Sequence, residues 1–229
     1  MVLVHSSDFH NGNGIDLHAR STIKRSFAYF ESLAVKIASE TIEFHHDHYF
    51  INGEKHLLTQ LPFAFGIGAH KYVVDQVDGK PNHTNYIIQL DDTSQIKIRF
   101  FKKFAKVDID GFATDFADSV GLLGNYSTGA MLGREGQTIN NSNDFGLEWQ
   151  VMPDQDPLLF QRARGPQLPV EHCRVPDVDS SSNRRLRGNT SLLSEAKEAC
   201  AHVRNKSVDF QLCVDDVLLT GEISLADLW

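Results

Sequence analysis

The amino-acid sequence predicts a mainly β protein, an antiparallel sandwich or meander followed by a small α-helical satellite. Three observations lead to this prediction. Short β-branched and aromatic runs, separated by Gly, Asn, Asp and Ser turns, extend from the start of the chain to about residue 118. Proline, serine and arginine then become frequent between residues 150 and 189. Beyond them, apolar residues recur every three or four positions, as on one face of a helix.

The predicted strands come from alternation of apolar and polar residues, which presents one face to a core. Asn52 and Gly53 supply a strong hairpin signal, because both residues accept positive φ. Later strands are separated by Asp-Gly-Lys-Pro, Asp-Asp-Thr-Ser and Asp-Gly turns, which favours antiparallel pairing. In chain order, the predicted strands are residues 1–4, 14–20, 33–37, 41–44, 48–51, 71–75, 85–90, 95–101 and 106–110.

The composition shifts divide the chain into three predicted segments. Residues 1–152 form the β domain, and residues 153–189 form a Pro-, Ser- and Arg-rich connector that we expect to be extended. Residues 190–229 form a small helical appendix with two cysteines. Its first helix is predicted by one apolar face, made of Leu192, Leu193, Ala196, Ala199, Cys200 and Val203.

Charge and hydropathy exclude two classes of partner. The 22 basic and 30 acidic residues give a net charge of −8, which makes nucleic acid an unexpected partner. Apolar runs such as residues 61–67 are far shorter than the roughly 18 residues that a membrane span needs. We therefore expect neither nucleic-acid binding nor a membrane span in this chain.

A secreted or cell-surface location is indicated by an excess of N-x-[ST] acceptor patterns. Such patterns begin at five asparagines, but Asn125 lies inside a tight turn, where a glycan fits poorly. The candidate glycosylation sites are therefore Asn82, Asn140, Asn189 and Asn205.

Residues 45–48, with the sequence His-His-Asp-His, raise the possibility of a metal site, because imidazoles and a carboxylate suit zinc or copper. On a strand, however, His46 and His48 would share one face while His45 and Asp47 share the other. A polar hairpin edge is the better interpretation of this segment, and the sequence predicts no metal ligand here.

Catalytic patterns are also weak. No G-x-S-x-G elbow occurs, and Gly66 with Gly68 lacks the rest of a phosphate-binding loop. Four aspartates, Asp108, Asp110, Asp115 and Asp118, could supply paired carboxylates for glycoside hydrolysis, but we expect them to be solvated instead. Three phenylalanines, Phe100, Phe101 and Phe104, could stack on a partner, but we expect them in the core. The sequence predicts no catalytic residue.

The most specific motif is Gly121-Leu-Leu-Gly-Asn-Tyr126, a predicted structural turn built on Gly121, Gly124 and Asn125. It is followed by the loop 133–139 and the segment Asp144-Phe-Gly-Leu-Glu-Trp-Gln-Val151. The order and spacing of these pieces resemble the von Willebrand factor type D family, in which a Gly-Leu-Cys/Leu-Gly-Asn-Tyr/Phe turn precedes a Phe-Gly-x-x-Trp segment. The resemblance extends weakly over the early strands and covers roughly residues 1–173.

Two departures from the family pattern concern the chemistry of the turn. Leu123 stands where many animal members have a cysteine, so that disulfide is absent. Family members also bind calcium in the loop after the turn. Calcium prefers six to eight oxygen ligands, and this loop offers no carboxylate between Asn125 and Glu135. No cofactor is therefore predicted, and calcium binding is an expectation that comes from the resemblance alone.

The tail is similar to the cysteine-bearing helical appendix that follows type D domains in cell-surface proteins, including those of microalgae. The resemblance implies that residues 1–4 are the stump of a strand whose first part, with a partner for Cys173, lay upstream. It also implies that Cys200 and Cys213 pair with each other. By this resemblance, we expect a non-catalytic structural or adhesion module of a larger cell-surface, matrix or cell-wall protein, with other extracellular proteins or polysaccharide as partners. A carbohydrate- or metal-binding domain is the alternative.

Overall fold

The structure of the chain, a computed structural model, describes residues 1–24, 27–66, 70–77, 82–152, 154–161, 190–203 and 208–229. By its internal contacts the chain divides into two compact units, Met1–Thr22 with Tyr29–Val175 and Ile23–Ala28 with Pro176–Trp229. Each unit is described by itself.

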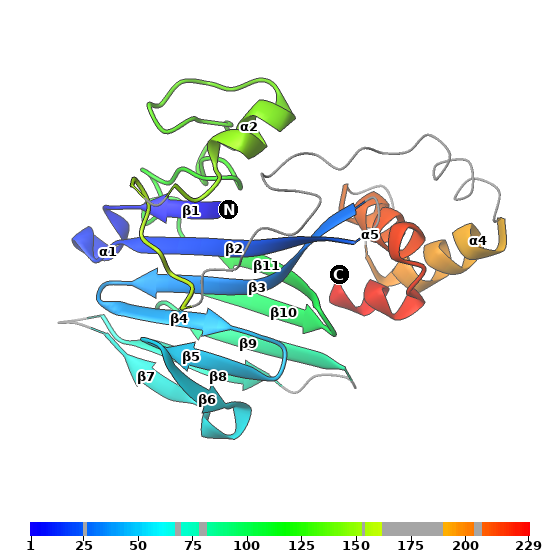
Figure 1. The fold of residues 1–229 in the computed structure, drawn as a ribbon, viewed down its shortest axis with the longest axis horizontal. Helices are drawn as coiled ribbons and strands as arrows, with labels where there is room; N and C mark the ends of the chain where they lie inside the picture. The colour runs from blue at the N-terminus through cyan, green and yellow to red at the C-terminus, as the bar shows by residue number, and fades with distance from the viewer. Residues whose placement is uncertain (25–26, 67–69, 78–81, 153, 162–189, 204–207) are drawn as a thin grey trace. The chain divides into compact units, whose positions relative to one another are not determined.

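Within the described residues, eleven strands form one antiparallel sheet (Figure 1). The strand order is β6-β5-β4-β3-β11-β10-β9-β8-β7. Strands β1 and β2 lie off this path: β1 pairs with β2, and β2 also pairs with β3. The strands are β1 (Val2–Ser6), β2 (Ile15–Lys24), β3 (Phe27–Ile37), β4 (Glu40–Phe44), β5 (His48–Ile51), β6 (Glu54–Leu57), β7 (Phe63–Phe65), β8 (Tyr72–Val77), β9 (His83–Gln89), β10 (Gln95–Phe101) and β11 (Phe104–Asp110).

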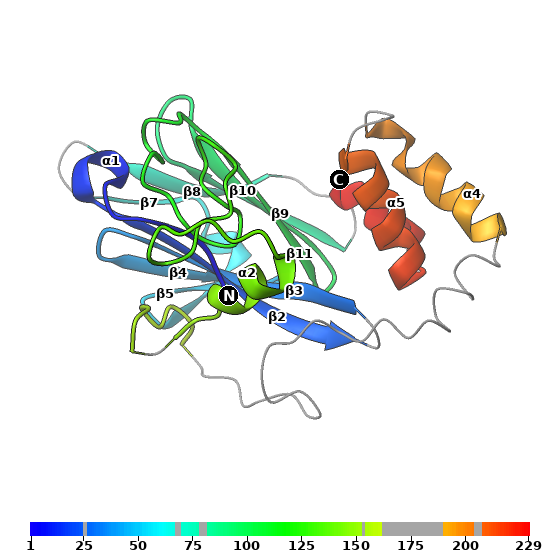
Figure 2. The same cartoon turned by 90° about the horizontal axis from the view of Figure 1, so that it is seen from above.

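The sheet curls at β3, which is long enough to have different neighbours along its length. Its second half, Leu33–Ile37, pairs with β4, whereas Phe30 in its first half lies opposite Ala105 of β11. Figure 2 shows the result, with β2–β5 and β8–β10 running as two facing layers. The layers are also joined through Tyr86, whose hydroxyl on β9 donates to the carbonyl oxygen of His45 at 2.7 Å.

The space between the layers is filled by the apolar faces that alternation predicts. On β9 and β10, every second residue is buried, for example Tyr86, Ile88, Ile96 and Ile98. Phe100 and Phe101 are buried as expected, and Phe104 is partly buried. Removing this much aromatic and branched surface from water is what holds the curled sheet closed.

The predicted strands are confirmed, with longer bounds for β2 and β3. The hairpin at Asn52 and Gly53 is also confirmed: both have positive φ, at 46° and 93°, and Ile51 pairs with Glu54. Short local elements complete this unit. They are α1 (Phe9–Gly12), η1 (Leu58–Gln60) and α2 (Ser142–Glu148), whose first turn is capped by the side chain of Asn141.

The predicted helical satellite is also present. It contains α4 (Thr190–Ala199), η2 (Cys200–His202), α5 (Val208–Thr220) and η3 (Ile223–Leu228). Cys200 and Cys213 form a disulfide, with their Cα atoms 6.0 Å apart. Ala196 and Val217 are buried as well. No helix in the described ranges is long and apolar enough to cross a membrane.

The predicted connector lies largely outside the described residues, as do Cys173 and Gly68. Its described part, residues 154–161, is bound to the sheet. Leu159 is buried, and the backbone N–H of Gln161 donates to the carboxylate of Glu43 at 3.0 Å. The first residues of this segment therefore belong to the β unit.

Candidate functional site

The turn that carries the family resemblance lies directly on β1. The N–H groups of Leu122 and Leu123 donate to the carbonyl oxygens of Val2 and Leu3 at 3.0 and 3.1 Å. Gly121 has a φ of +136°, and a Cβ at this position would lie 2.3 Å from the Leu3 oxygen. Only glycine allows the two backbones to approach so closely.

Asn125 is the polar centre of this turn and is 7% exposed. Its side-chain nitrogen donates to the carbonyl oxygens of Ala117 and Ser119 at 3.1 and 3.0 Å. Its side-chain oxygen accepts from the N–H and hydroxyl of Thr128 at 3.0 and 2.9 Å. Gly124, before it, adopts a φ of +79°. The amide is fully used inside the protein, so a glycan or a metal ion would have to break these bonds.

The Trp segment also closes on β1. Trp149 accepts a hydrogen bond from Val2 at its carbonyl oxygen and donates its indole N–H to Leu132 at 3.0 Å. Arg134 lies over the indole ring, 4.8 Å from its centre, and makes two bonds to Asp156 at 2.7 and 2.9 Å. Burial alone would favour the neutral acid, but the hydrogen bonds from Arg134 keep the pKa of Asp156 below its usual value. The turn at Gly121 and the Trp149 segment therefore both hold β1 through backbone hydrogen bonds.

Residues 45–47 connect β4 to β5, as the predicted strand bounds require, so the four side chains do not alternate across a strand. His46 and Asp47 form a bend, and the rings of His45 and His48 stack with their centres 4.5 Å apart. Their polar partners differ: His45 contacts Glu43 at 2.8 Å, and His48 contacts Asp47 at 2.7 Å. The group is a polar hairpin edge with its own ion pairs.

The four aspartates we expected to be solvated have different environments. Asp110 is exposed, as expected, but Asp108 pairs with Arg99. Asp118 accepts bonds from Ser7 and from neighbouring turn residues, which hold its pKa below the usual value although burial opposes ionisation. Asp115 is partly buried and faces a histidine. Asp108 is paired across the β10–β11 ladder, and the expectation failed for Asp115 and Asp118 because the chain after β11 folds back onto the turn that follows β1.

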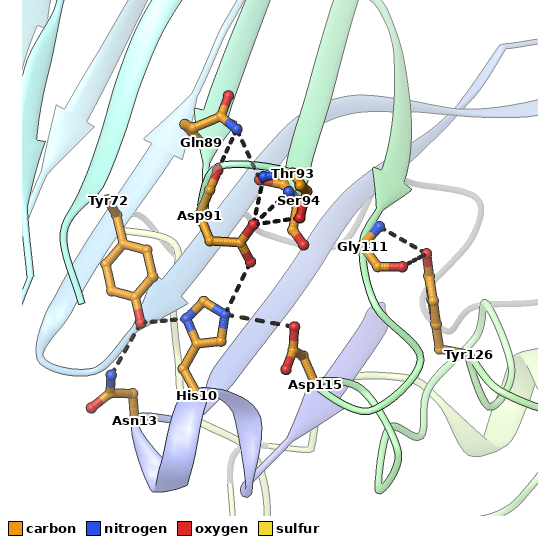
Figure 3. A network of polar contacts seen from close by, with 10 residues as sticks. All are labelled: His10, Asn13, Tyr72, Gln89, Asp91, Thr93, Ser94, Gly111, Asp115 and Tyr126. Atoms are coloured by element: carbon orange, nitrogen blue, oxygen red, sulfur yellow. Dashed lines mark hydrogen bonds and ion pairs between the residues drawn. The ribbon is translucent and has the colours of Figure 1, made fainter. Parts of the chain in front are cut away.

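Among the described residues, one group of three side chains brings possible metal ligands together: His10, Asp91 and Asp115, whose ligand atoms lie within 4.8 Å of one another (Figure 3). His10 lies in α1, the short turn-like element after β1, Asp91 in the turn between β9 and β10, and Asp115 in the segment after β11. His10 Nε2 is 3.6 Å from Asp91 Oδ2 and 3.9 Å from Asp115 Oδ2.

Away from the carboxylates, His10 contacts Phe9, His70 and Tyr72. Its Nδ1 lies 3.1 Å from the hydroxyl of Tyr72, which also accepts a bond from Asn13 at 3.1 Å. The rings of Phe9 and His70 stack against the imidazole. Burial and the nearby His70 lower the pKa of His10, so the ring is neutral at neutral pH.

Local hydrogen bonds stabilise the ionised form of the Asp91 carboxylate. Its Oδ1 accepts from the N–H groups of Thr93 and Ser94 at 2.7 and 2.8 Å, and from the Thr93 hydroxyl. Burial raises the pKa of Asp91, but these bonds outweigh it and lower the value to about 2. Its second oxygen is left for His10, as Figure 3 shows.

Nothing in the sequence indicates that these three residues meet. The Asp-Asp-Thr-Ser segment predicts only a turn between strands, and Asp115 is only one of four candidate carboxylates. His10 stands in a Gly- and Asn-rich loop, whose composition predicts a turn but not its partners.

The remaining predicted positions are placed as follows. Asn82 and Asn140 are exposed, while Asn189 and Asn205 lie outside the described residues. No protein-family model matches the chain, and no curated protein matches it. The likeness to the von Willebrand factor type D family therefore rests on the residues quoted for it alone.

Proposed function

We propose that this chain is a non-catalytic structural module of an extracellular protein, of the von Willebrand factor type D kind, acting in adhesion or assembly at a cell surface, matrix or cell wall. The observation that carries the proposal is how the motif residues are used. Gly121 lies against Leu3 of β1, Asn125 bonds to Ala117, and Trp149 bonds to Leu132, so their polar groups and close contacts are used inside the β unit. Such a motif serves architecture.

A second support is the kind of covalent bond present. The Cys200–Cys213 disulfide suits an oxidising compartment, because thiols in the cytosol are kept reduced. The exposed acceptor asparagines, Asn82 and Asn140, are accessible to a glycosyltransferase in the same compartment.

The location can be tested with antibodies against the full chain, applied to the cells that make it. Labelling of intact, unpermeabilised cells or of their wall and matrix fraction is expected. Labelling that appears only after permeabilisation would contradict the proposal. Treatment with an N-glycosidase should also lower the apparent mass, and the paired variant Asn82→Gln with Asn140→Gln should reduce that change.

The alternative of a carbohydrate-binding domain gives a different result. A glycan array probed with the full chain is expected to be flat if the module is structural. Saturable binding to one sugar class would replace the structural proposal with a lectin-like one.

A further inference from the structure

We propose that His10, Asp91 and Asp115 form a site for a divalent transition-metal ion, with Zn²⁺ as the best-fitting ion and Tyr72 as the outer partner of the histidine. This inference does not depend on the proposed extracellular role. It rests on four features of the site: spacing, burial, the way each ligand is oriented, and the contrast with other histidines of the same structure.

The spacing of the ligand atoms is close to that of a zinc site. Zinc bonds of about 2.0–2.2 Å to nitrogen and oxygen in tetrahedral geometry separate the ligand atoms by roughly 3.3–3.6 Å. His10 Nε2 lies 3.6 Å from the Asp91 oxygen and 3.9 Å from that of Asp115. All three ligand atoms lie within 4.8 Å of one another, so side-chain shifts of up to about an ångström would bring them to bonding distance.

Other histidines of this protein show what an ordinary His–carboxylate contact looks like here. His5 approaches Asp16 to 2.7 Å, and His45 approaches Glu43 to 2.8 Å. His10 faces two carboxylates at longer distances, 3.6 and 3.9 Å from Nε2. The three groups converge on a common centre, and these longer separations are compatible with an ion between them.

His10 is oriented as metal-binding histidines usually are. A metal-bound imidazole donates its other N–H to a fixed oxygen, which sets the tautomer. Here Nδ1 lies 3.1 Å from the Tyr72 hydroxyl oxygen, which Asn13 holds in place (Figure 3). With the proton on Nδ1, the lone pair of Nε2 points at the two carboxylates. The His10 side chain is only 5% exposed, so bulk water does not readily reach it.

The two carboxylates are held differently. Asp91 uses Oδ1 for its own turn and presents Oδ2 to the centre. Asp115 also presents Oδ2. Their side chains are 32% and 26% exposed, which leaves a path from solvent to the site. A divalent ion would balance their two charges, and water or a small anion could fill the fourth position.

The donor set separates this ion from calcium and magnesium. Calcium takes six to eight oxygen ligands, and magnesium strongly prefers oxygen. A buried imidazole nitrogen with two carboxylate oxygens suits zinc and its first-row neighbours. Because the ligands come from three separate turns, a bound ion would cross-link these turns and stabilise the folded chain.

The test is isothermal titration of the metal-stripped full chain with ZnCl₂, with thermal unfolding measured in parallel. We expect one Zn²⁺ per chain at this site, and an increase of roughly 5–10 °C in Tm when free zinc is about a hundredfold above Kd. Millimolar Ca²⁺ or Mg²⁺ should produce neither effect. Absence of zinc binding up to 1 mM would overturn the proposal.

Three variants assign the binding event. Asp115→Asn keeps the shape of the side chain and should weaken zinc binding at least tenfold, and His10→Gln should abolish it. The matched control, Asp110→Asn, changes an exposed carboxylate of the neighbouring segment and should leave Kd unchanged. If His10→Gln does not fold, judged by circular dichroism, Asp115→Asn and Asp110→Asn still decide the question.

A competing site at the stacked pair His45 and His48 is separated by a fourth variant. If His48→Ala removes the zinc binding while Asp115→Asn leaves it intact, the proposal is wrong. Cobalt gives a further readout: visible absorption of the Co²⁺ form should be lost in Asp115→Asn and kept in His48→Ala.

Discussion

His18 should make the stability of this protein fall as the pH drops from 6.5 towards 4. The residue lies on β2, is 1% exposed, and has no hydrogen-bond partner for either ring nitrogen among the described residues. Burial, and to a lesser degree the charge of the N-terminal amino group, lower the pKa of His18 from 6.5 to about 4. In the folded protein the ring therefore stays neutral in this window.

The sign and size of the effect follow from the difference between the pKa of His18 in the unfolded chain and its pKa in the folded protein. Below pH 6.5 the unfolded chain binds a proton at His18 that the folded chain does not bind, so the free energy of unfolding decreases. Each pKa unit corresponds to about 1.4 kcal/mol, which gives a total loss of about 3 kcal/mol by pH 4. Above pH 6.5 the residue should contribute no pH dependence.

The assay is urea unfolding, followed by circular dichroism at several pH values from 7.5 to 4.0, on the wild type and on His18→Leu. Leucine has a similar volume and no polar atoms, so we expect equal or greater stability at pH 7.5. The difference between the two proteins should grow as the pH falls. Taking this difference removes groups present in both, such as Asp118 with its lowered pKa and His5 with its raised pKa.

The matched control is His46→Leu, which removes a partly exposed imidazole that contacts the carbonyl oxygen of Asn82. This variant should keep the pH dependence of the wild type. The reasoning about His18 is refuted if His18→Leu and the wild type change in parallel between pH 7 and 4.5.

Three further changes test other parts of the structure. Gly121→Ala should lower the free energy of unfolding by more than about 3 kcal/mol, because the new methyl group meets the backbone of β1. Gly129→Ala, with open space around it, should lower it by about 1 kcal/mol, and equal losses in the two variants would contradict this reasoning. Arg134→Lys should lose about 2 kcal/mol in urea unfolding, since lysine cannot form the paired bonds to a carboxylate; an unchanged midpoint would show that the pair contributes little. Replacing Cys200 and Cys213 together by serine should destabilise the helical unit by about 3 kcal/mol through a less constrained unfolded state, measured as a lower Tm that reductant does not lower further.

The local features of this protein could be predicted from its sequence, because each depends on neighbouring residues. Alternation predicts nine of the eleven strands and misses the short β6 and β7. Asn52 with Gly53 predicts a hairpin, since both adopt left-handed φ without a large penalty. The apolar face around Ala196 and Cys200 placed a helix. The turn at Gly121 was recognisable for the same reason, although its contact with β1 was not.

Only the tertiary structure decided which turns meet. The branching of the sheet at β3 brings the turn of His10, the β9–β10 turn of Asp91 and the segment of Asp115 to one place, although they are far apart in the chain. Periodicity reports which face of a strand is buried, but it contains no information about how a sheet curls.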